Sequence, residues 1–205
     1  MNAILSLLVP LVIAPMPARI RGTVESLRGD TLTVRTAKAS VAITLPPKTA
    51  VVSVIPADRG RIKDGAFLGI ASVPGPKGAQ VARDVVVFPE SARGTGEGSY
   101  PWDLPGGKTS KMTNGTVHAL PSRMTNGTAS LGGGETLTLR YKSSKGTGSQ
   151  TIRLAPGIPV VTFEPGTMAE LKKGAHVIVF AHAGPNRTTL ADRVLVGKNG
   201  LVPPM

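Results

Sequence analysis

Cysteine is absent from the 205-residue sequence. Without thiols the chain forms no disulfide bond, no thiolate metal site and no cysteine nucleophile, and it lacks the lipid-modified cysteine of a bacterial lipoprotein. Aromatic residues are few, at one Trp, two Tyr and four Phe, whereas Gly (25) and Pro (18) are plentiful. This balance predicts many short strands joined by tight turns and disfavours a helix bundle.

The sequence also lacks an apolar stretch long enough to cross a membrane as a helix. The most apolar stretch, residues 3–14 (AILSLLVPLVIA), has twelve residues, whereas a spanning helix needs about 20. A stretch of this length followed by Pro-Met-Pro-Ala fits a signal peptide cleaved near Ala18, although no Lys or Arg precedes it. We therefore expect residues 1–18 to be a signal peptide and the mature protein to be periplasmic or secreted. The alternative is that these residues form a buried first strand or helix.

Acidic residues are half as frequent as basic ones: 12 Asp and Glu stand against 24 Lys and Arg, a formal net charge of +12. All of them follow position 18, so the mature chain keeps this charge. A strongly basic protein attracts anionic partners through its long-range field. The Lys and Arg residues are scattered, with no run of five, so a contribution to solubility alone is an equally good interpretation.

An internal repeat organises the chain. Residues 62–88 align without a gap to residues 171–197 at an offset of 109, with eight of 27 positions identical. Upstream, Thr31–Arg35 aligns with Thr136–Arg140 at an offset of 105, which places a four-residue insertion in a loop at 142–150. The sequence therefore contains two copies of one structural unit.

The start of the second copy has two solutions. The sequence Met-Thr-Asn-Gly-Thr occurs at 112–116 and again at 124–128. Gly22 of the first copy therefore aligns with either Gly115 or Gly127. We begin the second copy at residue 126, and a start at Gly115 is the alternative.

Both copies share one predicted order of elements. A short helix is expected between Asp58 and Gly65, and in the second copy Thr167 and Glu170 form a capping box for it. In the first copy, alternating apolar and polar residues predict strands at 20–27, 31–36, 66–72 and 80–88, and a broken third strand at 41–45 and 51–55. This order of elements is that of an OB-type barrel.

The predicted fold is all-β, with two tandem small OB-like β-barrels, each containing one short helix. We expect the first barrel at residues 19–89 and the second, with a C-terminal tail, at residues 126–205. Residues 90–125 form a Gly/Pro-rich inter-barrel segment between them.

Several motifs resemble a family of OB-like domains of unknown function found in bacterial secreted proteins. Gly22-Thr23-Val24, residues 29–34 (GDTLTV) and Lys63-Asp64-Gly65 carry the family pattern. The layout with RGTGEG at 93–98 and PWDL at 101–104 is similar to that of small periplasmic proteins with two such units in tandem. Some of these carry a metal-transporter permease name, which a chain without membrane-spanning helices does not support. The resemblance implies an envelope protein and identifies no known chemistry.

Two places in the sequence are candidates for ligand binding. Arg35 and Arg140 occupy the same outward position on the second strand of each copy, and Tyr141, next to Arg140, is the one aromatic candidate on a second strand. OB barrels commonly bind ligands on that face, and the alternative is a solvated strand face. Tyr100 and Trp102, in the inter-barrel segment, are either the aromatic anchor of a recognition loop or a plug in the seam between the barrels.

Residue patterns typical of catalysis or metal binding are missing. The glycine-rich stretch 94–98 is not followed by a helix pattern, so it is not a nucleotide-binding loop. His176 and His182 fall on one face of a strand but about 20 Å apart, too far to share an ion. No Gly-x-Ser-x-Gly elbow is present. We therefore expect no metal, no cofactor and no enzymatic activity.

These expectations favour an exported, non-enzymatic binding or scaffold protein of the bacterial envelope. Its partner would be an unknown protein or an anionic envelope polymer. One alternative is an OB module that binds nucleic acid or another polyanion, which export and the scarcity of stacking aromatic residues disfavour. Another is an accessory factor in metal handling, which the small number of ligand residues disfavours.

Overall fold

The computed structural model describes residues 18–104, 109–119, 135–144 and 146–204, and of the predicted signal peptide only Ala18 lies within them. The all-β prediction is confirmed, because the described residues form thirteen strands of one continuous sheet. Their only helical elements are 3-10 turns of three residues. The strands of the first repeat are β1 (Ala18–Arg28), β2 (Thr31–Arg35), β3 (Ser40–Thr44), β4 (Ala50–Pro56), β5 (Phe67–Pro74) and β6 (Gln80–Val87). After β7 (Gly98–Trp102), those of the second repeat are β8 (Ser110–Ala119), β9 (Glu135–Ser143), β10 (Gly146–Leu154), β11 (Val160–Pro165), β12 (His176–Ala183) and β13 (Thr189–Gly197).

Five strands close into a barrel in the order β10–β9–β8–β5–β6, with β6 pairing in parallel to β10. The other pairs within it are antiparallel, so the barrel is mixed. Its interior is filled by inward-facing aliphatic side chains such as Leu68, Leu139 and Ile152, which follow the two-residue period of a strand. Eight strands lie outside this barrel, and the structure does not show the two separate barrels that were predicted.

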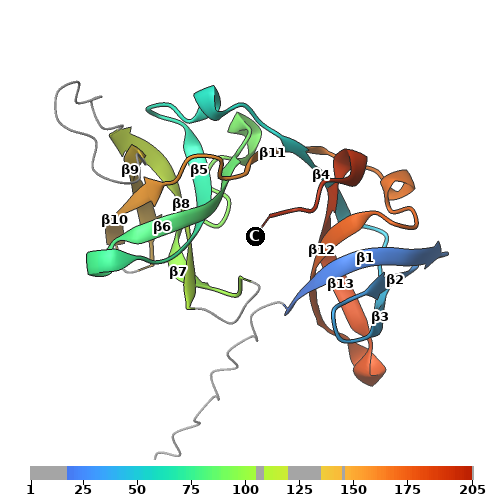
Figure 1. Ribbon diagram of the computed structural model, residues 1–205. Helices are drawn as coiled ribbons and strands as arrows, with labels where there is room; N and C mark the ends of the chain where they lie inside the picture. Colours follow the sequence, from blue (N-terminus) through green and yellow to red (C-terminus); the bar gives the residue numbers. More distant parts are fainter. Residues whose placement is uncertain (1–17, 105–108, 120–134, 145, 205) are drawn as a thin grey trace, which may run out of the picture.

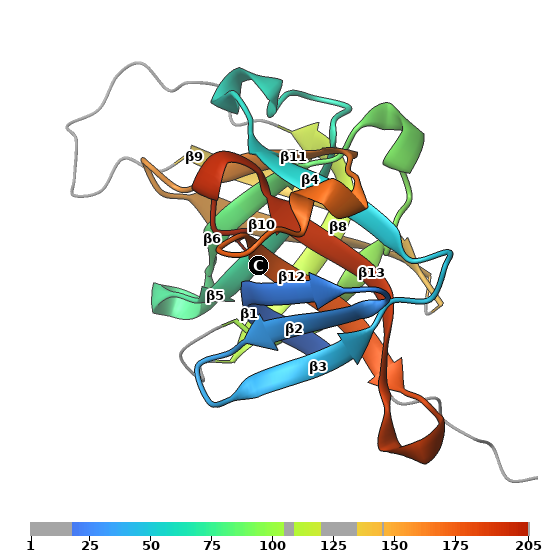
Figure 2. The same ribbon diagram turned by 90° about the vertical axis from the view of Figure 1, so that its right-hand side faces the viewer.

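The strands are grouped across the repeats. The closed barrel takes β5 and β6 from the first repeat and β8, β9 and β10 from the second. The strands β1, β2 and β3 of the first repeat are instead joined through β1 to β12 and β13 of the second, and we call these five strands the second group. Its end strands, β3 and β13, pair at the single position Thr44–Leu190. Figure 1 shows the closed barrel on the left and the second group on the right, and Figure 2 turns the second group toward the viewer.

Strand exchange between the repeats has a simple physical basis. Because both repeats contain the same strands, β12 offers β1 the same edge that β5 offers β8, so the exchanged ladder forms equivalent hydrogen bonds. The registers agree with this explanation. Gly22 pairs with Val177, and Gly115 pairs with Leu68, which is the counterpart of Val177 at the repeat offset of 109.

An approximate two-fold axis relates the two halves of the sheet. The antiparallel pair β4–β11 lies at the centre, and within it Val54 faces Phe163, its own counterpart at the offset of 109. The flanking parallel pairs obey the same relation, since Val194 faces Val51 as Val85 faces Val160. The β4–β11 pair is therefore the junction about which the repeats exchange strands.

The structure also identifies the counterpart of Gly22. Thr23 faces Arg35 across β1 and β2, and Thr116 faces Arg140 across β8 and β9. Gly115 therefore occupies the position of Gly22, at an offset of 93. The strand that contains it, β8, lies inside the stretch predicted to be an inter-barrel segment, whereas Gly127 lies outside the described residues.

The predicted short helices are 3-10 turns instead. In η1 (Arg59–Arg61), the carboxylate of Asp58 accepts a hydrogen bond from the Gly60 N–H. In η4 (Met168–Glu170), Thr167 makes no capping hydrogen bond, and the Glu170 carboxylate accepts one from the Ser53 hydroxyl across the fold. The linking segments hold about ten residues each, too few to repay the cost of nucleating an α-helix between two fixed strands.

The predicted broken third strand is two separate strands. β3 pairs with β2 and touches β13 at one position, whereas β4 pairs with β13 over five positions and with β11. Pro46-Pro47 separates them, because proline cannot supply the N–H groups that a continuous strand needs. This break sends β4 out of its own repeat to the centre of the molecule.

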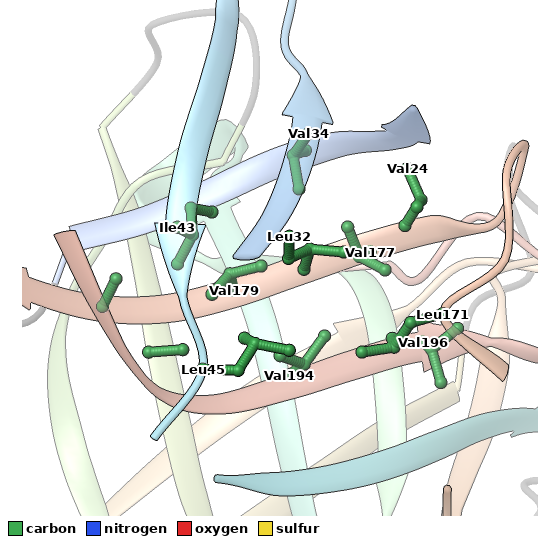
Figure 3. Close-up of a cluster of buried hydrophobic side chains, with 12 residues drawn as sticks. Val24, Leu32, Val34, Ile43, Leu45, Leu171, Val177, Val179, Val194 and Val196 are labelled. Carbon is green, nitrogen blue, oxygen red and sulfur yellow. The ribbon is translucent and has the colours of Figure 1, made fainter. Parts of the chain in front are cut away.

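Three apolar clusters fill the interior. The first lies within the second group, where side chains from β1, β2, β3, β12 and β13 converge, as Figure 3 shows for Leu32, Ile43 and Val194. The second fills the closed barrel. The third lies between the two groups and includes Val86 of β6, Leu195 of β13 and Phe163 of β11. We call this third cluster the seam.

Candidate binding site at the seam

The seam exists because β6 and β13 are each buried on both faces. On β13, Val194 and Val196 belong to the core of the second group, whereas Leu195 belongs to the seam. On β6, Val85 belongs to the barrel core and Val86 to the seam. Such near-continuous apolar runs are typical of strands covered on both sides. Any polar side chain on the seam face therefore lies in a largely apolar environment.

The strand β7 brings the two predicted aromatic site residues to the seam. It pairs with β8, and the rings of Tyr100 and Trp102 lie 6.0 Å apart in an edge-to-face arrangement. The guanidinium of Arg19, on β1 of the second group, lies 3.8 Å from the centre of the Trp102 ring. This cation–π contact joins the two strand groups. The indole Nε1 of Trp102 is buried and has no hydrogen-bond partner among the described residues.

Asp103 holds the start of β1 against the end of β7. Its carboxylate accepts a hydrogen bond of 2.5 Å from Nε of Arg19 and two of 3.1 and 3.2 Å from Arg21. Burial acts to raise the pKa of Asp103, but the hydrogen bonds from Arg21 and Arg19 outweigh it and hold the pKa below its ordinary value. The first charged residue after the predicted signal peptide is thus fixed in the seam, with a side chain only 11% exposed.

The glycine-rich stretch 94–98 is anchored to the seam by Asn114. Its amide nitrogen donates to the carbonyl oxygens of Thr95 and Gly96, at 3.2 and 3.0 Å, and to the hydroxyl of Tyr100 at 3.2 Å. Gly96 adopts a φ of 58°, a conformation that glycine takes without strain. The Asn114 side chain is buried, and its Oδ1 has no partner among the described residues.

A cleft opens along the seam beside these residues. Its inner part, with a volume of about 70 Å³, reaches Tyr100, Trp102 and Asn114. Its outer part, of about 280 Å³, extends past Val52 and Ala92. The residues that line both parts are Phe88, Thr95, Phe163, Arg193 and Leu195. We call the two parts together the seam cleft.

Arg193 is the cationic group that lines the whole cleft. It is half-buried on β13, with its guanidinium 4.2 Å from the centre of the Phe180 ring. Among the described residues, no hydrogen bond or ion pair engages this guanidinium. Burial lowers the pKa of Arg193, and the nearby Tyr100 and Asp192 only partly oppose this effect. Within the described part of the chain, Arg193 therefore has no ion-pair partner of the kind that usually accompanies a buried charge.

The counterpart of Arg193 in the first repeat is Asp84, at the offset of 109. Both residues sit at a bulge, between Ala71 and Ser72 opposite Asp84 and between Phe180 and Ala181 opposite Arg193. Asp84 is 3% exposed, and its Oδ1 has no partner within the described part of the chain. Burial raises the pKa of Asp84 to about 7, although a hydrogen bond from the Ala71 backbone and the charge of Arg21 oppose the rise.

The other predicted site residues are not brought to the seam. Arg35, on β2, forms an exposed ion pair with Glu25, and Arg140 lies exposed on β9. β2 and β9 belong to opposite strand groups, on either side of the molecule in Figure 1. Tyr141 packs its ring over Gly148 of the neighbouring strand, where an added Cβ would lie 2.7 Å from the ring. The structure thus unites Tyr100 and Trp102 but not Arg35 with Arg140.

The sequence did not identify Asn114 and Arg193, which line the seam cleft, or Asp84, the counterpart of Arg193 in the first repeat. The repeat alignment pairs Asp84 with Arg193. A position that is acidic in one repeat and basic in the other was the sequence signal that could have identified both residues. Asn114 lies in the repeated Met-Thr-Asn-Gly-Thr motif, but nothing in that motif indicates that its side chain is buried.

The described residues contain no group of three or more His, Asp or Glu side chains placed to hold a metal ion. His182 lies 2.8 Å from the Asp192 carboxylate, and His176 lies 3.4 Å from the Thr23 hydroxyl. Within the same residues, no helix has the length and apolar character needed to cross a bilayer.

Comparisons with protein-family models, with curated proteins and with solved structures found no match to this chain. The resemblance to bacterial OB-like domains therefore stays a prediction. The structure shows an all-β protein that contains a five-stranded mixed β-barrel.

Proposed function

We propose that this protein is an exported, non-enzymatic binding protein of the bacterial envelope and that its ligand occupies the seam cleft. The observation that carries the proposal is Arg193, a half-buried cation that lines a mostly apolar cleft and forms no ion pair with any described residue. A concave, mostly apolar site with a few convergent polar groups is the usual form of a ligand-binding site. The Trp102, Tyr100 and Asn114 side chains line its inner end.

The proposal extends to the architecture. When β3 with β4, and β10 with β11, are each counted as the one broken third strand of a repeat, the strands of the closed barrel follow the order three, two, one, four, five. The parallel pair β10–β6 then joins strands three and five. This order supports an OB-like barrel assembled from both repeats. The second group has the same strand order, and we propose that it is the matching OB-like unit.

Export is tested on the N-terminus of the mature protein. If the signal peptide is removed near Ala18, protein from the periplasmic fraction of a bacterial host begins at Arg19 or a close neighbour. N-terminal sequencing or intact mass measures this directly. A full-length product confined to the cytoplasm would overturn the export proposal.

The binding site is tested by filling the cleft. Ala92 lines its outer part, so Ala92→Phe places a ring in the space that a ligand would occupy. The control is Ala37→Phe, at an exposed turn outside the cleft. Thermal shift with benzoate, benzyl alcohol and benzylamine is expected to show stabilisation by at least one probe. Ala92→Phe should abolish the shift and Ala37→Phe should keep it, and equal shifts in both variants would place binding elsewhere.

A further inference from the structure

We propose that the ligand of the seam cleft is a small carboxylate with an apolar body, whose carboxylate pairs with Arg193. This inference rests on the proposed function and names the chemical class of its ligand.

The charge of the cleft selects an anion. The guanidinium of Arg193 makes no hydrogen bond or ion pair within the described residues, so its donors are free for a ligand. Two carboxylates lie near it and each has a partner. Asp192, its neighbour along the chain, lies 2.8 Å from His182. Glu164, which lines the outer part of the cleft, lies 3.7 Å from the Lys198 ammonium. A guanidinium presents paired N–H donors whose spacing matches the two oxygens of a carboxylate. A cationic ligand would meet Arg193 with repulsion at the same place.

The walls of the cleft select an apolar body. Phe88, Phe163 and Leu195 line both its inner and its outer part. The outer part, about 280 Å³, lies just below the volumes of roughly 300–1,000 Å³ that usually hold ligands, so it suits a small ligand. An aromatic ring or a short aliphatic chain fits this space. Inorganic phosphate or a highly charged polymer would leave these apolar walls unfilled.

Arg193 and Trp102 line the same inner cavity, so the guanidinium and the indole ring lie at one end of the cleft. A carboxylate can accept both paired N–H donors of a guanidinium, whereas an alcohol offers one oxygen that also carries a hydrogen. The guanidinium of Arg193 therefore favours a carboxylate over a neutral ligand of equal size.

The test uses Trp102 as its own reporter, because it is the only Trp of the chain. Its fluorescence is followed while the full-length mature protein is titrated with benzoate, benzyl alcohol and benzylamine, which share one ring and differ in charge. We expect benzoate to bind roughly tenfold or more tightly than benzyl alcohol, as a hydrogen bond to a charged group allows. Benzylamine should bind most weakly.

Arg193→Leu should remove the preference for benzoate, and Arg193→Gln provides a second variant that keeps a polar side chain. The matched control is Arg83→Leu, which removes an exposed arginine from β6, the counterpart strand of β13. Equal affinity for benzoate and benzyl alcohol, or an unchanged preference in both Arg193 variants, would overturn the carboxylate inference and leave the proposed function standing. If no probe changes Trp102 fluorescence or the melting temperature, both are overturned.

Discussion

At one tight turn, equivalent positions of the two repeats carry residues that differ in how well they tolerate a positive φ. The turn after β5 contains Gly78 at a φ of 76°, and the matching turn after β12 contains Arg187 at a φ of 60°. A side chain with a Cβ pays about 1–2 kcal/mol for the left-handed conformation, which glycine adopts without that cost. At this position Arg187 therefore stores strain that Gly78 avoids.

We predict that Arg187→Gly raises the free energy of unfolding by about 1 kcal/mol, because the strain is relieved at an exposed position where little contact is lost. Urea denaturation of the two proteins measures the difference. Arg61→Gly is the control, since Arg61 is exposed in η1 without a positive φ, and there glycine should lower stability. A loss of stability in both variants would contradict the prediction.

Asp84 predicts a pH dependence of stability. Its pKa lies near 3.8 in the unfolded chain and is raised by burial to about 7 in the folded protein. Above pH 3.8 the unfolded state loses this proton while the folded state keeps it, so the contribution of Asp84 becomes destabilising as pH rises and levels off above about 7. Asp84→Asn should therefore be more stable than the natural protein at pH 8, by an amount of order a few kcal/mol.

The measurement is the difference in unfolding free energy between Asp84→Asn and the natural protein at pH 5 and at pH 8. Because other titrating groups are common to both, they cancel in this difference. The gain from the substitution should be larger at pH 8 than at pH 5. A gain that is the same at both values would show that Asp84 does not titrate in this range.

At the scale of elements, the strands were predictable and the helices were not. The six expected strand segments of the first repeat lie within two residues of β1 to β6, because alternation of apolar and polar residues depends only on which face is buried. The four extra residues of the second repeat lengthen β9 and β10 and do not enlarge a loop. The capping pattern at Thr167 indicated a helix, but two fixed strands leave room there only for a 3-10 turn.

The close approach of β1 to β2, and of β8 to β9, depends on one glycine in each pair. A Cβ on Gly22 would lie 2.1 Å from the Arg35 carbonyl oxygen, and a Cβ on Gly115 would lie 2.4 Å from that of Arg140. Both contacts are with backbone, which cannot move without opening the ladder. The same packing requirement therefore recurs at the start of each repeat.

We predict that Gly22→Ala and Gly115→Ala each lower the free energy of unfolding by roughly 1–3 kcal/mol, the usual cost of overpacking. Chemical denaturation of both variants measures the losses. The control is Ser91→Ala, at an exposed turn. A glycine such as Gly157 cannot serve as the control, because its φ of 73° would strain an alanine there whatever the packing. A tolerated substitution at Gly115 alone would show that it is not the counterpart of Gly22.

At the scale of the whole molecule, the sequence shows that the strands are repeated, but it does not show which repeat supplies the neighbour of each strand. Periodicity predicts that β1 needs an antiparallel neighbour, and β5 and β12 supply the same pattern at the offset of 109. The order of strands along the chain favours pairing within a repeat, whereas the structure pairs β1 with β12. What separates the two solutions is the geometry of β4 and β11 at the centre, which local patterns do not encode.

The candidate site follows from the same exchange and was therefore hidden in the sequence. Tyr100 and Trp102 were identifiable as rare aromatic residues in a segment that interrupts the repeat. Arg193 and Arg19 lie far from them along the chain and reach the seam because the second group packs against the closed barrel. Arg35 and Arg140 were selected for matching positions, and matching positions lie far apart in a molecule with an approximate two-fold axis.

The exchange of strands is tested most directly by disulfide cross-linking, since the natural chain contains no cysteine. Thr23 of β1 faces His176 of β12, with Oγ1 and Nδ1 3.4 Å apart, whereas two barrels folded in sequence would place Thr23 opposite Phe67. Directly opposed residues of antiparallel strands lie within the Cα separation that a disulfide spans. We predict that the double variant Thr23→Cys, His176→Cys oxidises to an intramolecular disulfide, seen by mass spectrometry of the folded monomer. The variant Thr23→Cys, Phe67→Cys should stay reduced, and a disulfide in this second variant but not in the first would contradict the strand exchange on which the seam cleft depends.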